Sequence, residues 1–142
     1  MALENLDNLV KIGSLKLEPP DQAEFEGMVR SAKSRLKDSQ IEGLSEDSSF
    51  SLAYGAAHAL ALAALRWHGY RSENRYLVFQ CLEQTVGLAN EKWRVLDKCH
   101  KQRNLAEYEG SLEVSPQLLK ELISITEELL QLVEALGTVV KE

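Results

Sequence analysis

Hydrophobic positions recur every three or four residues along most of the chain, which is the period of helices that bury one face. The pattern predicts a short helix over residues 3–12 that ends at Gly13, and a second helix after the break at Pro19, Pro20 and Asp21. No segment shows the alternation of strands joined by hairpin turns. We therefore expect an all-α protein.

The third predicted helix is rich in alanine. It begins in the serine-rich segment 45–49, whose side chains are good helix caps, and ends at Gly69. Small side chains occupy nearly every side of it, at Ala53, Ala56, Ala57, Ala59, Ala61, Ala63 and Ala64. Such a helix can have close neighbours on several sides, so we expect it at the centre of the fold.

Two more helical segments complete the predicted fold. One runs from residue 75 to residue 103 or 108 with a break near 87–90, and the last begins with Ser115 as the cap and Pro116 in the first turn. The last helix has a wide stripe of leucine and valine, which indicates burial on more than one side. We predict a four-helix up-and-down bundle over residues 21–142, with residues 1–20 as an extension that carries a short extra helix.

The charge balance limits the kind of partner. A chain of 142 residues with a net charge of −6 is one ordinary domain that does not coat nucleic acid through bulk electrostatics. One segment is locally basic, and its charged residues are Lys92, Arg94, Lys98, Lys101 and Arg103. Any nucleic-acid site must therefore be local.

Cysteine usage and hydropathy favour the cytoplasm. Cys81 and Cys99 are isolated thiols, and the chain opens without a basic and then apolar export signal. The longest apolar run, residues 56–65, is far short of the roughly 20 residues that span a bilayer. We expect a cytoplasmic protein with no membrane role.

Metal and cofactor sites are not expected. His58, His68 and His100 fall on different predicted helices or helix ends, and the sequence has no Cys-x-x-Cys or Glu-x-x-His pair. It also has no glycine-rich phosphate loop. Within the alanine-rich helix, His58 is expected to be a hydrogen-bonded core residue.

Arg103 interrupts an apolar stripe. Leu96, Cys99 and Ala106 follow one another at helical spacing, and Arg103 lies in the gap. A guanidinium is rarely buried without a partner, so a carboxylate, a second subunit or a substrate phosphate should face it.

Several polar residues accompany this arginine. At helical spacings of three, four and seven, His100, Arg103, Asn104, Glu107 and Tyr108 lie on one face of the predicted helix. As one polar surface they have the groups needed to hold a phosphodiester and to move protons near it. Alternatively, Arg103 pairs with Glu107 and the other residues face solvent.

Two stretches carry a resemblance to a known family. Residues 49–71, "SFSLAYGAAHALALAALRWHGYR", and residues 103–108, "RNLAEY", resemble the second main helix and the signature of the HEPN domain, named for higher eukaryotes and prokaryotes nucleotide-binding. The resemblance spans residues 21–136. It implies a four-helix up-and-down bundle that forms a homodimer, with both signature segments lining a shared cleft. Many members are metal-independent ribonucleases, often toxins paired with a small nucleotidyltransferase antitoxin.

The signature is incomplete. Its first half is an arginine followed by a polar residue, which Arg103 and Asn104 match, but Tyr108 occupies the slot of the expected histidine and no histidine follows. Gly110 occupies the place of a tyrosine that the partner enzyme modifies in some toxins. His100, one turn before Arg103, is a candidate substitute for the acid or base.

This departure favours binding over catalysis. We expect a HEPN-like cytoplasmic homodimer that binds RNA, a nucleotide or a partner protein through an Arg103-centred cleft, within a toxin–antitoxin system. One alternative is a metal-independent endoribonuclease toxin that uses Arg103 with His100 or Tyr108. The other is a non-catalytic structural dimer module, in which Arg103 pairs with an acid of its own chain or of the second subunit.

Overall fold

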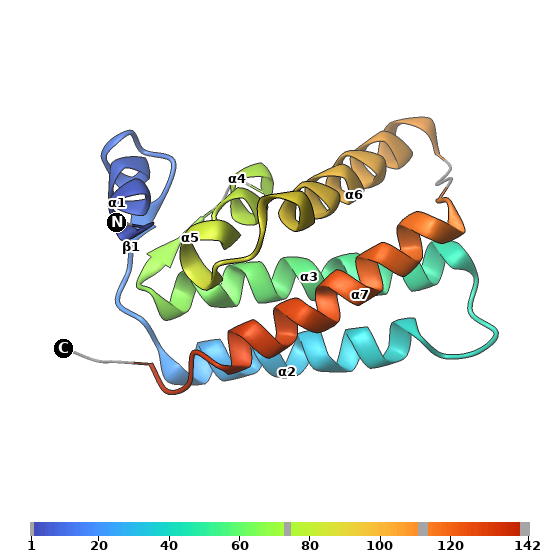
Figure 1. The fold of residues 1–142 in the computed structure, drawn as a ribbon, viewed down its shortest axis with the longest axis horizontal. Coiled ribbons are helices and arrows are strands. Elements are labelled where there is room, and N and C mark those ends of the chain that lie inside the picture. The colour runs from blue at the N-terminus through green and yellow to red at the C-terminus, as the bar shows by residue number, and fades with distance from the viewer. Residues whose placement is uncertain (1, 73–74, 111–113, 140–142) are drawn as a thin grey trace.

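The computed structural model describes residues 2–72, 75–110 and 114–139, and the chain is mostly helical (Figure 1). Its elements in order are α1 (Ala2–Lys11), β1 (Lys16–Leu17), α2 (Gln22–Ser39), α3 (Glu46–Trp67), β2 (Tyr70–Arg71), α4 (Arg75–Gln80), α5 (Leu82–Val86), α6 (Asn90–Glu109) and α7 (Pro116–Glu134). The protein is therefore all-α apart from one small strand pair.

Helix α3 is the central element, as its alanines predict. It contacts α2 and α7 along its length and also α4, α5 and α6 (Figure 1). Six of its alanines are fully buried, namely Ala53, Ala56, Ala57, Ala61, Ala63 and Ala64. Small side chains let the neighbouring helices approach closely, and this explains why so many elements surround one helix.

The helix starts predicted from capping residues are confirmed. The side chains of Asp21, Ser45 and Ser115 accept hydrogen bonds of 2.9, 3.1 and 3.0 Å from backbone N–H groups in the first turns of α2, α3 and α7. Each bond satisfies one of the N–H groups that a helix start leaves without an intrahelical partner. These starts fix where the three long helices begin.

The segment 75–109 contains one break more than predicted. The break at Gly87 is confirmed, because Gly87 takes the left-handed conformation (φ 71°) that ends α5. A further break at Cys81 separates α4 from α5. No glycine or proline marks this second break, so the sequence pattern runs through it.

One short strand pair is present that the hydrophobic pattern does not indicate. Lys16 and Leu17 pair antiparallel with Arg71 and Tyr70, so β1 joins the segment after α1 to the segment after α3. Two residues per strand are too few to produce a visible alternation.

The N-terminal extension is packed into the fold. Leu6 and Leu15 are almost completely buried, and α1 contacts α5. The hydroxyl of Tyr70 donates a hydrogen bond of 2.6 Å to the carboxylate of Asp7. Residues 4–17 therefore contact the core through both apolar and polar groups.

Arg66, in the last turn of α3, ties this end of the molecule together. Its side chain is 2% exposed, and its Nε lies 2.5 Å from the Glu24 carboxylate. The same guanidinium donates to the backbone carbonyls of Glu18, Pro19 and Tyr70 at 3.0, 2.9 and 3.4 Å. One buried cation thus holds the chain before α2, the start of α2 and β2 against the end of α3.

By length and composition alone, α3 is apolar enough to cross a membrane, and within the described ranges it is the one helix that is. However, 61% of its most apolar window is buried inside the protein. Packing against the surrounding helices therefore accounts for its apolar character.

Candidate functional site

Arg103 on α6 lies over the ring of Tyr54 on α3. The guanidinium carbon is 5.0 Å from the ring centroid, within the range of a cation–π contact. Tyr54 is 1% exposed, whereas Arg103 is half-buried at the edge of the core. Among the described side chains, no carboxylate pairs with Arg103. Within its own chain, the partner of Arg103 is thus an aromatic face.

A hydrogen-bonded chain holds Tyr54 in place. Its hydroxyl is 2.6 Å from Nδ1 of His100, and Nε2 of His100 is 3.1 Å from the amide nitrogen of Asn104. If that amide donates to Nε2, then Nδ1 carries the ring proton and donates to the Tyr54 oxygen. Both ring nitrogens of the buried His100 are thereby engaged in positioning Tyr54.

A cavity of about 320 Å³ lies beside this contact and is bounded by three helices. Its lining comes from α2, α3 and α6 and consists of Arg35, Ser51, Leu52, Tyr54, Gly55, His58 and Arg103. The volume is at the lower end of the range for small-molecule sites. Two of the lining side chains are arginines from different helices, so the cavity is cationic.

Gly55 makes room for the second arginine. A Cβ atom at this position would lie 3.1 Å from Nη1 of Arg35, which is tighter than an ordinary contact. Glycine inside a helix destabilises it by roughly 1 kcal/mol relative to alanine, so its presence in the middle of α3 needs a reason. The Arg35 guanidinium lies close against the α3 backbone at this glycine.

Five of the other described cations are paired with carboxylates. Lys33 pairs with Glu134 at 2.7 Å and Lys92 pairs with Glu128 at 2.5 Å. Lys101 pairs with Asp97 at 3.2 Å, and Arg66 and Arg71 share Glu18 and Glu24. Arg35 and Arg103 have no such pair among the described residues.

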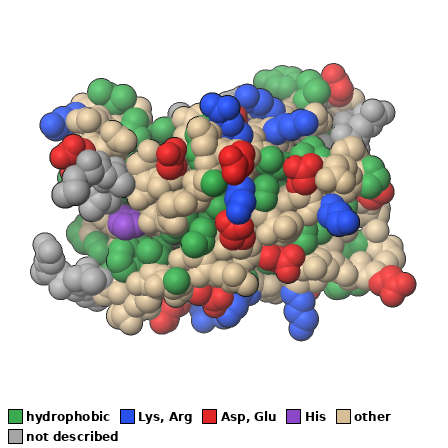
Figure 2. All heavy atoms as spheres, viewed as in Figure 1, with side chains coloured by type: hydrophobic (Ala, Val, Ile, Leu, Met, Phe, Trp, Pro, Cys, Tyr) green, Lys and Arg blue, Asp and Glu red, His purple; other side chains and the backbone are tan. Residues whose placement is uncertain are grey.

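The locally basic segment lies on α6. Figure 2 shows basic side chains gathered along the upper edge of the molecule, where α6 runs in Figure 1. Because Lys92 and Lys101 are already paired, the segment is less positive than its sequence suggests.

The residues predicted as one polar surface are not placed alike. His100 is buried, Asn104 is half-buried beside it, and Tyr108 is 92% exposed. Of these three, none lines the cavity that contains Arg103. The side chain of Glu107, the alternative partner of Arg103, lies outside the described residues.

Of the seven cavity residues, only Arg103 was identified as a site residue from the sequence. Arg35 and Tyr54 were not singled out, and His58 was expected in the core. His58 does contact core rings, with centroids 6.2 Å from Tyr54 and 6.1 Å from Phe79, but it also lines the cavity. The adjacent Tyr54 and Gly55, a large and a minimal residue in an alanine-rich helix, are the signal that marks this turn.

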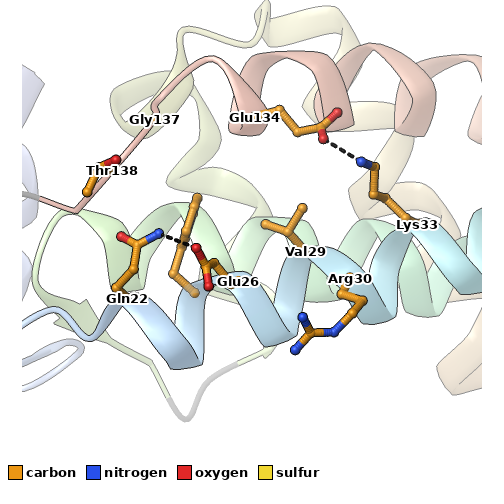
Figure 3. Close-up of a pocket in the computed structure, with 9 residues that line it drawn as sticks. Gln22, Glu26, Val29, Arg30, Lys33, Glu134, Gly137 and Thr138 are labelled. Carbon is orange, nitrogen blue, oxygen red and sulfur yellow. Dashed lines mark hydrogen bonds and ion pairs between the residues drawn. The ribbon is translucent and has the colours of Figure 1, made fainter.

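A second cavity, of about 490 Å³, lies between α2 and the end of α7 (Figure 3). Four of its polar side chains already have partners: Lys33 faces Glu134, and Gln22 donates to Glu26 at 2.9 Å while accepting from the backbone N–H of Val139 at 2.7 Å. Its lining includes the carboxylates of Glu26 and Glu134, whereas the described lining of the Arg103 cavity has none, so it is less suited to an anionic ligand.

Metal and thiol chemistry have no support in the described ranges, where no group of three or more His, Cys, Asp and Glu side chains is placed to hold a metal ion. Burial raises the pKa of the Cys81 thiol to about 11 and that of Cys99 to about 12. Both thiols therefore stay protonated and weakly nucleophilic at neutral pH.

Comparison with known proteins adds no assignment, because the sequence matches no protein-family model and no curated protein.

Proposed function

We propose that the cavity between α2, α3 and α6 binds a phosphate-bearing ligand, with Arg103 as the main anion-binding group. The observation that carries this proposal is the placement of a half-buried guanidinium on the ring of a buried tyrosine, with no described carboxylate beside it. A guanidinium stacked by its flat face keeps its in-plane N–H groups free to form paired hydrogen bonds with phosphate oxygens.

The proposed ligand class is a nucleotide or a short RNA. It is supported by the resemblance of residues 49–71 and 103–108 to HEPN domains and by the small size of the cavity, which suits one nucleotide unit. The same resemblance supports a cytoplasmic homodimer in which α2, α3, α6 and α7 form a four-helix up-and-down bundle. It also supports a place beside a small nucleotidyltransferase in a toxin–antitoxin system.

Binding is proposed in preference to cleavage. Ribonuclease chemistry needs a positioned acid or base, whose contribution is typically on the order of 10² to 10⁴ in rate. His100 is buried with both ring nitrogens engaged, and Tyr108 is fully turned to solvent. Neither side chain is placed to move a proton at a ligand bound to Arg103.

Calorimetric titration with adenosine monophosphate and with a short single-stranded RNA tests the proposal. Arg103→Ala should weaken binding by about tenfold or more, because a hydrogen bond to a charged group contributes about 1.5–3 kcal/mol. Arg94→Ala is the matched control, since Arg94 is on the same helix and also lies over an aromatic ring, Trp93, but does not line the cavity. The affinity of the Arg94→Ala variant for both ligands should stay within about twofold of the wild-type value.

The contrary results are equally definite. Failure of the wild type to bind either ligand, or equal binding by Arg103→Ala, would overturn the proposal. Cleavage of the RNA in the presence of a metal chelator, abolished by Arg103→Ala, would instead favour the ribonuclease. Destabilisation by Arg103→Ala with unchanged binding would favour the structural module.

A further inference from the structure

Two arginines bracket one turn of α3. Tyr54 and Gly55 are consecutive, and Arg103 lies on the ring of the first while Arg35 lies against the backbone of the second. The two guanidinium groups come from α6 and α2, so three helices place them on one cavity. Ser51, one turn earlier on α3, adds a neutral hydroxyl to the lining.

Both charges lack a carboxylate among the described residues. Two like charges facing one cavity repel each other, and the repulsion is stronger beside an apolar wall than in bulk water. The buried ring of Tyr54 and the side chain of Leu52 form the apolar part of the lining. A ligand that carries two negative charges would neutralise the pair, whereas a ligand that carries one would leave an excess positive charge.

This charge count separates two classes of phosphate. A phosphate monoester carries about −1.5 to −2 at pH 7, because its second pKa is near 6. A phosphodiester carries only one negative charge. We infer that Arg35 is a second phosphate-binding residue and that the cavity prefers a terminal phosphate monoester to an internal phosphodiester. The inference rests on the proposed function, because it concerns the same cavity and the same kind of ligand.

The test compares a nucleoside 5′-monophosphate with its phosphate methyl ester, which differs by one charge. We expect the wild type to bind the monoester about tenfold or more tightly, as one charge-assisted contact implies. Arg35→Ala should weaken monoester binding by a similar factor and change ester binding much less, so that the preference shrinks. Arg35→Lys should restore part of the preference, since it keeps the charge without the fork.

Arg30→Ala is the matched control. Arg30 is an exposed arginine on α2 that lines the other cavity, so its removal should leave both affinities unchanged. Because Arg35 is also exposed, its variants should keep the fold, which circular dichroism of each protein verifies.

The outcomes separate this inference from the proposed function. If Arg103→Ala loses binding while Arg35→Ala binds both compounds like the wild type, Arg35 is not a phosphate-binding residue and the proposed function stands. If the wild type binds both compounds equally, the preference for a monoester is disproved. If it binds neither, the proposed function fails as well.

Discussion

The ring and the hydroxyl of Tyr54 have separate roles. The ring packs against the Arg103 guanidinium, and the hydroxyl is hydrogen-bonded to the buried His100 at 2.6 Å. A guanidinium held by its flat face is oriented without using its N–H groups, whereas a carboxylate partner would occupy them. At the scale of the residue, this arrangement keeps Arg103 both fixed and available.

Two substitutions of Tyr54 should separate these roles. Tyr54→Phe keeps the ring and removes the hydroxyl, so the free energy of unfolding should fall by about 1–3 kcal/mol because a buried polar group loses its partner, while ligand affinity stays near the wild-type value. Tyr54→Leu removes the ring as well, and affinity should then fall together with stability. Denaturant unfolding and calorimetry measure the two quantities. Equal affinities of the Phe and Leu variants would contradict a role for the ring.

Arg103 itself could be found from the sequence because a charge in an apolar stripe is a local irregularity. Arg35 could not, because it sits among other polar residues of α2 and only the register between α2 and α3 brings it to Gly55. The environment of His100 could not be predicted either. His100 was expected on a polar surface, but it is buried and hydrogen-bonded to Tyr54, which is 46 positions away. Residue spacing along one helix does not encode these contacts between helices.

At the scale of the element, α3 shows which features a local pattern encodes. Its start at a serine cap, its end before Gly69 and its alanine-rich surface were predictable, because capping and small-residue packing depend on neighbouring positions. The burial of the Arg66 side chain was not predictable, because its hydrogen-bond partners belong to residues 18–24 and to β2. The two-residue strands escaped prediction because they are too short to show an alternation of apolar and polar residues.

Arg66 should matter more to stability than Arg71, although both pair with Glu18 and Glu24. Arg66→Ala should lower the free energy of unfolding by about 3 kcal/mol or more, because it breaks a buried ion pair and leaves three backbone carbonyls without a donor. Arg71 is 34% exposed on its side chain, and Arg71→Ala should cost about 1 kcal/mol or less. Urea unfolding of both variants measures these changes. Equal losses of unfolding free energy would show that the burial of Arg66 gives it no greater importance for stability than Arg71.

At the scale of the whole molecule, distant parts of the chain meet at the end where α3 finishes. Helix α1 and the described segment after α7 lie toward this end in Figure 1. Trp67, the last residue of α3, donates from Nε1 to the carbonyl of Gly137 at 3.1 Å, and β1 pairs with β2. The Arg103 cavity is instead lined by a late turn of α2, early turns of α3 and a late turn of α6. The contacts of Trp67 and of the strand pair therefore lie at the end of α3, whereas the candidate site uses its earlier turns.

The contact between Tyr70 and Asp7 should make the attachment of the N-terminal extension sensitive to alkali. Burial and the neighbouring Asp7 carboxylate raise the pKa of Tyr70 from 10.0 to about 12. Since the folded state favours the protonated phenol, its contribution to stability is fully present below pH 10 and is lost as the pH rises from 10 to about 12. The stability difference between the wild type and Tyr70→Phe should therefore be constant up to about pH 9.5 and should shrink above it.

Urea unfolding at a series of pH values measures this difference. Tyr108→Phe is the control, because Tyr108 is 92% exposed and its removal should not change the alkaline loss of stability. If Tyr70→Phe lost stability above pH 10 as steeply as the wild type, Tyr70 would not be the titrating group. The extension would then depend chiefly on Leu6 and Leu15, whose apolar burial does not respond to pH.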